Sequence, residues 1–231
     1  MKIKICGLTN PADAKVVGQA GADYVGTVLV PGTPRAVGPE TARTVSEAAG
    51  LPLVIVVADL SAEETVRAAR SSGAWGIQLH GSETEELLAR LRAEGEWELW
   101  KVARVRTAAD ITRAVERFGG VADGVLLDAW HPGQLGGTGS TFAWDLLEEL
   151  RPRLPAGVSL GVAGGLDPRN VREAVLRMRP GLVDVSSGVE RSRGQKDPDR
   201  VRAFVRAARE AWDEVRVVDS RPDETKESTS R

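Results

Sequence analysis

The segment "VSLGVAGGLDPRNVREAVLRMRPGLVDVSSGVE", residues 158–190, holds one full unit of alternating secondary structure. The apolar run Val158–Val162 predicts a buried strand, and the apolar spacing over Pro168–Met178 predicts an amphipathic helix. Leu182–Val185 predicts a second short strand. Two glycines follow the first strand, and two serines and a glycine follow the second. A strand, a helix and a strand in this order form a βαβ unit, in which the two strands are parallel.

The same alternation continues on both sides of this segment. Some predicted helices begin where a capping side chain precedes a proline, as at Asn10-Pro11 and Asp167-Pro168, because proline suits the first helical turn. The predicted strands are Lys2–Cys6, Asp23–Leu29, Leu53–Val57, Gly76–Leu79, Glu98–Val102, Gly124–Asp128, Val158–Val162 and Leu182–Val185. The predicted helices are Pro11–Ala20, Pro39–Ala49, Ala62–Ser71, Glu83–Arg92, Ala108–Arg117, Phe142–Leu150, Pro168–Met178 and Pro198–Val215.

Eight strand–helix units within 231 residues favour an α/β fold, a single-domain (β/α)8 barrel of the TIM type. An open doubly wound sheet is the alternative. We place the barrel in residues 1–216. Residues 217–231 turn polar, and we expect them to form a disordered tail.

The amino-acid composition argues against several classes of function. The net charge is -2, with 31 basic and 33 acidic residues, and aromatic residues make up only 4%. Neither feature favours a nucleic-acid partner. One cysteine and two histidines argue against a zinc site, and no run approaches the roughly 20 apolar residues of a membrane-spanning helix. We expect a cytoplasmic protein without metal, cofactor or membrane partner, acting as a monomer or a homodimer.

Functional groups of such a barrel lie at the carboxyl ends of its strands. Alternation along the first strand places Lys4 and Cys6 inside the barrel, with Cys6 at the mouth. Lys4 needs a buried partner, for which Asp184 and Asp128 are both candidates. A nearby ammonium favours a thiolate, so we expect Lys4 to lower the pKa of Cys6. The alternative is that Cys6 is a small buried apolar residue.

A second candidate lies in "LLDAWHPGQLGGTGSTFAW", residues 126–144. The strand ends on Asp128, and a glycine-rich loop over residues 133–139 follows. This pattern indicates an acid at the barrel mouth beneath a loop that can close over a ligand. The alternative is an aspartate at an ordinary strand end.

Further candidates concern binding. Arg35, in a loop rich in proline and glycine, could hold a carboxylate through two hydrogen bonds or could be a solvated surface residue. His80 could contact a ligand or hydrogen-bond locally. The loops after the seventh and eighth strands suit phosphate, because glycine-rich turns expose backbone N–H groups. The phosphate candidates are Gly164, Gly165, Ser187 and Gly188.

Several motifs, taken in order, carry a family resemblance. These are "KIKICGLTNPADA", "QLHG", "LLDA" with "GGTGSTFAW", "AGGLDPRNV", and "VDVSSGVE" with "GQKD". Together they resemble the phosphoribosylanthranilate isomerases of tryptophan biosynthesis. The match runs from Lys2 to about Ala211, and the opening and closing motifs are highly specific in combination.

The resemblance implies a (β/α)8 barrel enzyme that converts N-(5-phosphoribosyl)anthranilate to 1-(2-carboxyphenylamino)-1-deoxyribulose 5-phosphate by an Amadori rearrangement. It implies that Cys6 is the general base, that Asp128 is the general acid and that Arg35 holds the anthranilate carboxylate. The chemistry itself asks for one acid and one base on opposite sides of the substrate, without a metal or redox cofactor.

Two departures from the family pattern stand out. The family often has "GFVF" where this chain has "GTVL", residues 26–29, and "FDW" where it has Phe142-Ala143-Trp144. We expect the first to alter the packing of the anthranilate ring and the second to weaken a helix start. Alternatives are a related or dual-substrate sugar-phosphate isomerase of histidine biosynthesis, which uses aspartate where this chain has Cys6, and a barrel that binds a phosphorylated metabolite without turnover.

Overall fold

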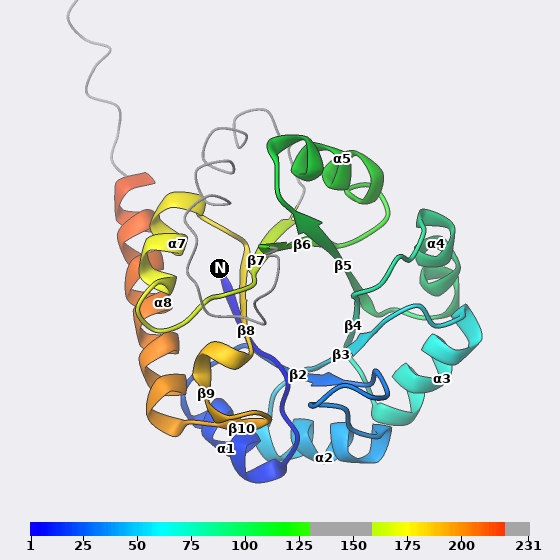
Figure 1. The fold of residues 1–231 in the computed structure, drawn as a ribbon, viewed down its shortest axis with the longest axis horizontal. Coiled ribbons are helices and arrows are strands. Elements are labelled where there is room, and N and C mark those ends of the chain that lie inside the picture. Colours follow the sequence, from blue (N-terminus) through cyan, green and yellow to red (C-terminus); the bar gives the residue numbers. More distant parts are fainter. Residues whose placement is uncertain (130–158, 220–231) are drawn as a thin grey trace, which may run out of the picture.

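Eight parallel strands close into a barrel in the order of the chain (Figure 1). This computed structural model describes residues 1–129 and 159–219. Closure is direct, because β1 pairs with β8 and Lys4 lies opposite Asp184 in the register. The predicted barrel is confirmed, and the open sheet is excluded. The strands are β1 Lys2–Ile5, β2 Tyr24–Val28, β3 Leu53–Val57, β4 Gly76–Leu79, β5 Glu98–Val105, β6 Gly124–Ala129, β7 Ser159–Ala163 and β8 Leu182–Val185.

Helices surround the barrel on its outer face (Figure 1). The predicted helix Phe142–Leu150 lies outside the described residues. Residues 217–219, which the sequence placed in the tail, continue the last helix. In the part of the chain that the structure describes, none of the helices has the length and hydropathy needed to span a membrane. The α-helices are α1 Pro11–Gln19, α2 Pro39–Ala49, α3 Ala62–Ser72, α4 Glu85–Glu94, α5 Ala108–Phe118, α7 Val171–Met178 and α8 Pro198–Asp219.

Capping side chains mark the starts of α1, α3, α4 and α5, and one predicted cap has another role. Asn10 accepts a hydrogen bond from the backbone of Asp13, as the sequence indicates for α1. The next predicted cap, Asp167, instead closes a turn by accepting from the backbone N–H groups of Arg169 and Asn170. The helix α7 therefore begins three residues later than proline at 168 suggests, at Val171.

The interior of the barrel changes character along its axis. An apolar cluster fills the half nearer the amino ends of the strands and includes Trp100, Leu126 and Leu182. Polar side chains lie above it, among them Lys4 and Gln78, which are almost fully buried. The larger apolar core lies outside the barrel, between the strands and the helices.

A short excursion follows β8 and was not predicted beyond its first turn. The 3-10 helix η2, Ser187–Val189, leads into a two-stranded hairpin, β9 Glu190–Ser192 and β10 Gln195–Lys196. Gly194 has φ +78° and allows the tight turn between them. The hairpin returns the chain toward the barrel mouth before α8 begins.

Candidate active site

A cavity of about 730 Å³ opens at the carboxyl ends of the strands. Every predicted site residue except Gly188 lines it, so residues separated widely in the sequence meet at one place. Gln78, Arg104, Asp184 and Ser186 also line this cavity, and none of these was named as a ligand contact from the sequence. The predicted site residues in its wall are Cys6, Arg35, His80, Asp128, Gly164, Gly165 and Ser187.

Cys6 follows β1 and is 7% exposed. Burial raises the pKa of its thiol, and Asp184 adds to this effect, whereas Lys4 and Lys196 oppose it. The expectation that Lys4 leaves the thiol with a lowered pKa is therefore wrong in net direction, because desolvation outweighs the two ammonium groups. Room for the thiol depends on Gly26, since a Cβ there would lie 2.9 Å from Sγ of Cys6.

Lys4 is fully buried beneath Cys6. Its Nζ donates to Oδ2 of Asp184 at 2.9 Å and to Oε1 of Gln78 at 2.8 Å. Of the two partners left open by the sequence, Asp184 is the one it has. Burial opposes the charge, but Asp184 and Cys6 outweigh it and the pKa of Lys4 is raised. Among the described residues Oδ1 of Asp184 has no hydrogen-bond partner.

Asp128 lies near the end of β6, opposite Arg104 on β5. Its Oδ2 is 3.6 Å from Nε2 of His80, which follows β4. Nδ1 of the same ring is 3.2 Å from Nε2 of Gln78. The predicted covering loop, residues 133–139, lies outside the described residues.

Arg35 is held by a partner that the sequence analysis missed. Its Nε and Nη2 donate to the two carboxylate oxygens of Glu190 at 2.7 and 2.6 Å. Nζ of the buried Lys196 donates to Oε1 of the same carboxylate at 3.0 Å. Burial raises the pKa of Glu190, but the two cations outweigh it and the pKa is lowered. The quoted motif "VDVSSGVE" with "GQKD" contains both Glu190 and Lys196 and is the signal that could have found them.

The predicted phosphate loops meet at the cavity wall. Gly164 and Gly165 have φ values of +80° and +68°, a region that favours glycine, and they lie beside Ser187 in the cavity lining. Gly188 does not line it. A Cβ at Gly188 would collide with the carbonyl group of Leu166, so this glycine permits close packing of two loops.

The departures from the family pattern at residues 27 and 29 lie away from the cavity. Thr27 is fully buried, and its Oγ1 has no hydrogen-bond partner among the described residues. Leu29 packs against the outer core, whereas Val28 lines the cavity. The expectation that residues 27 and 29 alter the packing of a ring in the site is not supported, because strand alternation turns both away from it. Ala143 lies outside the described residues.

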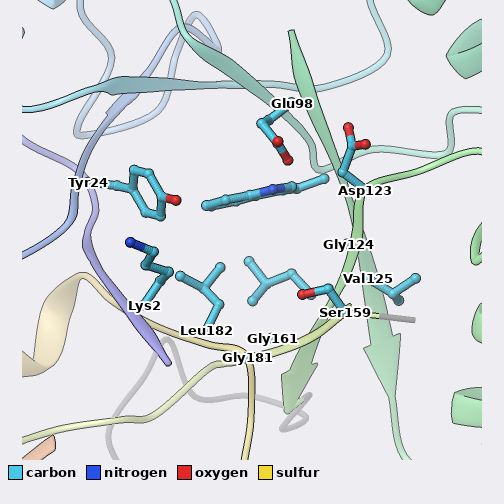
Figure 2. Close-up of a pocket in the computed structure, with 12 residues that line it drawn as sticks. Lys2, Tyr24, Glu98, Asp123, Gly124, Val125, Ser159, Gly161, Gly181 and Leu182 are labelled. Carbon is cyan, nitrogen blue, oxygen red and sulfur yellow. The ribbon is translucent and has the colours of Figure 1, made fainter. Parts of the chain in front are cut away.

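The opposite end of the barrel holds a much smaller cavity, of about 110 Å³ (Figure 2). Tyr24, Glu98 and Asp123 face it from three different strands or turns. Drug-sized ligands need roughly 300–1,000 Å³. Of the cavities at the two ends of the barrel, the one at the carboxyl ends has room for a substrate with a ring, a sugar and a phosphate. In residues 1–129 and 159–219, no three His, Cys, Asp or Glu side chains are grouped to hold a metal ion.

A closed barrel with a charged cavity at the carboxyl ends of its strands defines the class of (β/α)8-barrel proteins that act on small molecules. Within that class, the sequence profile of the N-(5'-phosphoribosyl)anthranilate (PRA) isomerase family matches residues 3–207. The chain belongs to this family.

Individual relatives agree. An N-(5'-phosphoribosyl)anthranilate isomerase of Rubrobacter xylanophilus is 43% identical over 210 residues, which are 90% of this chain and 98% of the relative. The crystal structure of the Thermotoga maritima isomerase has a TM-score of 0.81 at 34% identity and covers 91% of this chain and 99% of its own. A further isomerase, with a TM-score of 0.78, 32% identity and the same coverage, was crystallised with reduced 1-(o-carboxyphenylamino)-1-deoxyribulose 5-phosphate.

Proposed function

We propose that this chain isomerises N-(5-phosphoribosyl)anthranilate to 1-(2-carboxyphenylamino)-1-deoxyribulose 5-phosphate in tryptophan biosynthesis, with Asp128 as general acid and Cys6 as general base. The observation that carries the proposal is one cavity shared by these two residues and Arg35, in a chain of this family. A related structure binds the reduced form of that product.

Asp128 begins the reaction from β6. It donates its proton to the ring oxygen of the ribose, and the bond between that oxygen and C1 breaks. The lone pair of the anilino nitrogen then forms an iminium with C1. The iminium withdraws electrons from C2 and acidifies its proton.

Cys6 completes the rearrangement from β1, which lies across the barrel from β6. Its thiolate takes the C2 proton, the electrons of that bond form C1=C2, and the iminium electrons return to nitrogen. The enolamine loses the proton of its C2 hydroxyl and gains one at C1, which gives the ketose. No atom is lost or added overall.

Arg35 can bind a carboxylate while it holds Glu190. A guanidinium has five N–H groups. Glu190 uses Nε–H and one N–H of Nη2, so the edge formed by Nη1 and Nη2 is left for the anthranilate carboxylate. Glu190 and Lys196 then fix the direction of that edge.

The loops after β7 and β8 supply the candidate partners of the phosphate. Gly164 and Gly165 lie in the loop after β7 and Ser187 lies after β8, and loops of this kind bind phosphate through backbone N–H groups. His80 faces the same cavity, with its Nε2 3.6 Å from Oδ2 of Asp128.

The proposal also covers the ligand, the cellular location and the oligomeric state of the protein. Its partner is a phosphorylated small molecule, and we propose that it acts in the cytoplasm as a monomer or a homodimer. One related structure describes monomers of a dimeric isomerase, so both states fit this fold.

A fluorescence assay of phosphoribosylanthranilate consumption tests the function. The purified chain should consume this substrate, and the same assay with the corresponding phosphoribosyl substrate of histidine biosynthesis should give little or no turnover. Binding of phosphoribosylanthranilate without consumption would overturn the proposal in favour of a binding protein.

A further inference from the structure

A chain of polar side chains crosses the barrel between the two reacting groups. Nζ of Lys4 donates to Oε1 of Gln78 at 2.8 Å, and Nε2 of Gln78 is 3.2 Å from Nδ1 of His80. Nε2 of His80 is 3.6 Å from Oδ2 of Asp128. Gln78 is 1% exposed, so water has little access to the centre of this chain.

The chemistry of Lys4 fixes the direction of every link. An ammonium has three donors and no acceptor, so the atom of Gln78 that faces Lys4 must be its carbonyl oxygen. The amide nitrogen of Gln78 therefore faces His80, and it can only donate. Nδ1 of His80 must accept, which leaves the ring hydrogen on Nε2.

We infer that Gln78 is a positioning residue, which holds His80 as a neutral imidazole with its hydrogen on Nε2, directed at the carboxyl group of Asp128. The inference rests on the proposed function for its catalytic consequence. The directions of the hydrogen bonds, from which the protonation of His80 follows, do not depend on the proposed function.

The neutral ring suits the role of Asp128. A second proton on Nδ1 would face the amide hydrogens of Gln78, so the charged imidazolium is disfavoured. An imidazolium beside Asp128 would hold the carboxylate ionised and leave no proton to donate. The neutral ring still offers Nε2–H to the carboxylate that forms when the proton leaves, and hydrogen bonds of this kind commonly shorten once substrate is bound.

Other charged groups surround this pair and enter any pH profile. Those that share the cavity with His80, or contact its neighbours, are Cys6 and Lys4 on the side of β1, Arg35 after β2, Asp59 after β3, Glu83 after β4, Lys101 and Arg104 on β5, Asp128 on β6 and Asp184 on β8. The variants must therefore show whether a substitution of Gln78 changes turnover through His80 or through Lys4 and Cys6.

The direct measurement is the protonation of the ring in the unaltered protein. The chain has two histidines, His80 and His131, so a ¹⁵N spectrum near neutral pH contains two imidazoles. The His80→Asn variant identifies the signals of His80. We expect an unprotonated Nδ1 and a protonated Nε2; a proton on Nδ1 of His80 would overturn the inference whatever the protein catalyses.

The variant Gln78→Glu reverses one link at nearly constant volume. A carboxylate can accept from Lys4 and also from a protonated Nδ1, so His80 should become an imidazolium. We expect turnover at neutral pH to fall by about 10- to 100-fold, as for a weakened general acid. The pH profile of turnover should shift as well, because a charge on His80 would lie beside Asp128.

The double variant Gln78→Glu with His80→Asn separates the two routes. If Gln78 acts through His80, the shift of the pH profile disappears in the double variant, because coupled residues are not additive. A shift that persists without His80 would show that Gln78 acts through Lys4 and Cys6, and would overturn the inference.

A matched control places the same substitution on the outside of the barrel. Gln19 is exposed on α1, and Gln19→Glu should leave turnover, the pH profile and the imidazole signals unchanged. Failure of the proposed function looks different from failure of the inference. A protein without isomerase activity but with the expected ring protonation refutes only the function, whereas an active protein with Nδ1 protonated refutes only the inference.

Discussion

The two ends of the barrel are built from the same eight strands and have opposite characters. At the carboxyl ends lies a cavity of about 730 Å³ with Cys6, Asp128 and Arg35 in its wall. At the amino ends Tyr24 and Glu98 face a cavity of about 110 Å³ (Figure 2). The ring of Tyr24 also stacks on Trp75, with centroids 4.8 Å apart. The difference predicts that activity and stability depend on different layers of one interior.

The free-energy cost of burying polar groups explains why the two ends of the barrel differ. A buried polar group needs a partner, and a buried charge needs one more strongly. The upper layer meets this need with mutual contacts such as Lys4 with Asp184, and the lower layer avoids it with apolar side chains such as Trp100 and Leu126. Variants at the mouth should therefore change turnover, and variants at the floor should change unfolding.

The largest effect is expected at the mouth. Asp128→Asn and Cys6→Ser should each lower kcat by roughly two to four orders of magnitude, because each removes a group that transfers a proton. Thermal unfolding should change little. Near-normal kcat in either variant would remove that residue from the mechanism.

At the floor, Trp100→Ala should do the reverse. Removing this buried ring should lower the free energy of unfolding by about 3–5 kcal/mol, as for other large-to-small core changes. The kcat of the fraction that remains folded should stay close to that of the unaltered protein. Denaturant titration and assays below the unfolding temperature measure both, and a specific loss of kcat would break the division between the two ends.

Arg35→Ala should act on binding. We expect KM to rise by about 10- to 100-fold with a smaller change in kcat, as for loss of one charged contact to the substrate. A substrate analogue that lacks the carboxylate is the control. If its KM rises equally, Arg35 serves only to hold Glu190 and the hairpin.

The pH dependence of Asp128→Asn should expose the base. Burial raises the pKa of Cys6 above its ordinary value of 9.0, so the thiolate forms only as the pH rises toward that raised value. With the acid removed, residual turnover should increase with pH and level off above pH 9.0. A rate that is flat between pH 7 and 9 would contradict a buried thiol base, because both of these pH values lie below the raised pKa of Cys6.

The smallest effect is expected between the sheet and the helices. Thr27→Val replaces a buried hydroxyl that has no partner among the described residues by a methyl group of similar size. Stability should rise by about 1 kcal/mol, with kcat and KM unchanged because the side chain lies outside the cavity. A loss of stability would show that the hydroxyl is hydrogen-bonded in solution.

The sequence predicted the barrel because strand and helix periods are local properties, and it predicted Cys6 and Asp128 because both follow apolar strand runs. It did not predict that Glu190 holds Arg35, since the two lie 155 residues apart, nor the reason for Gly188, which depends on the neighbouring Leu166 carbonyl. The direction of the Cys6 pKa was mistaken because the degree of burial cannot be read from a motif. The predicted burial of Lys4 indicated an acidic partner but did not decide between Asp184 and Asp128.

The contact between Lys4 and Asp184 joins residues 180 positions apart. A ribosome releases the amino end first, so β1 emerges with its lysine long before the acid that neutralises it has been made. The barrel cannot close, and Cys6 cannot acquire its surroundings, until β8 has left the exit tunnel. A nascent chain that stalls before residue 184 should therefore have no activity. Activity should appear only once the chain has been synthesised through β8.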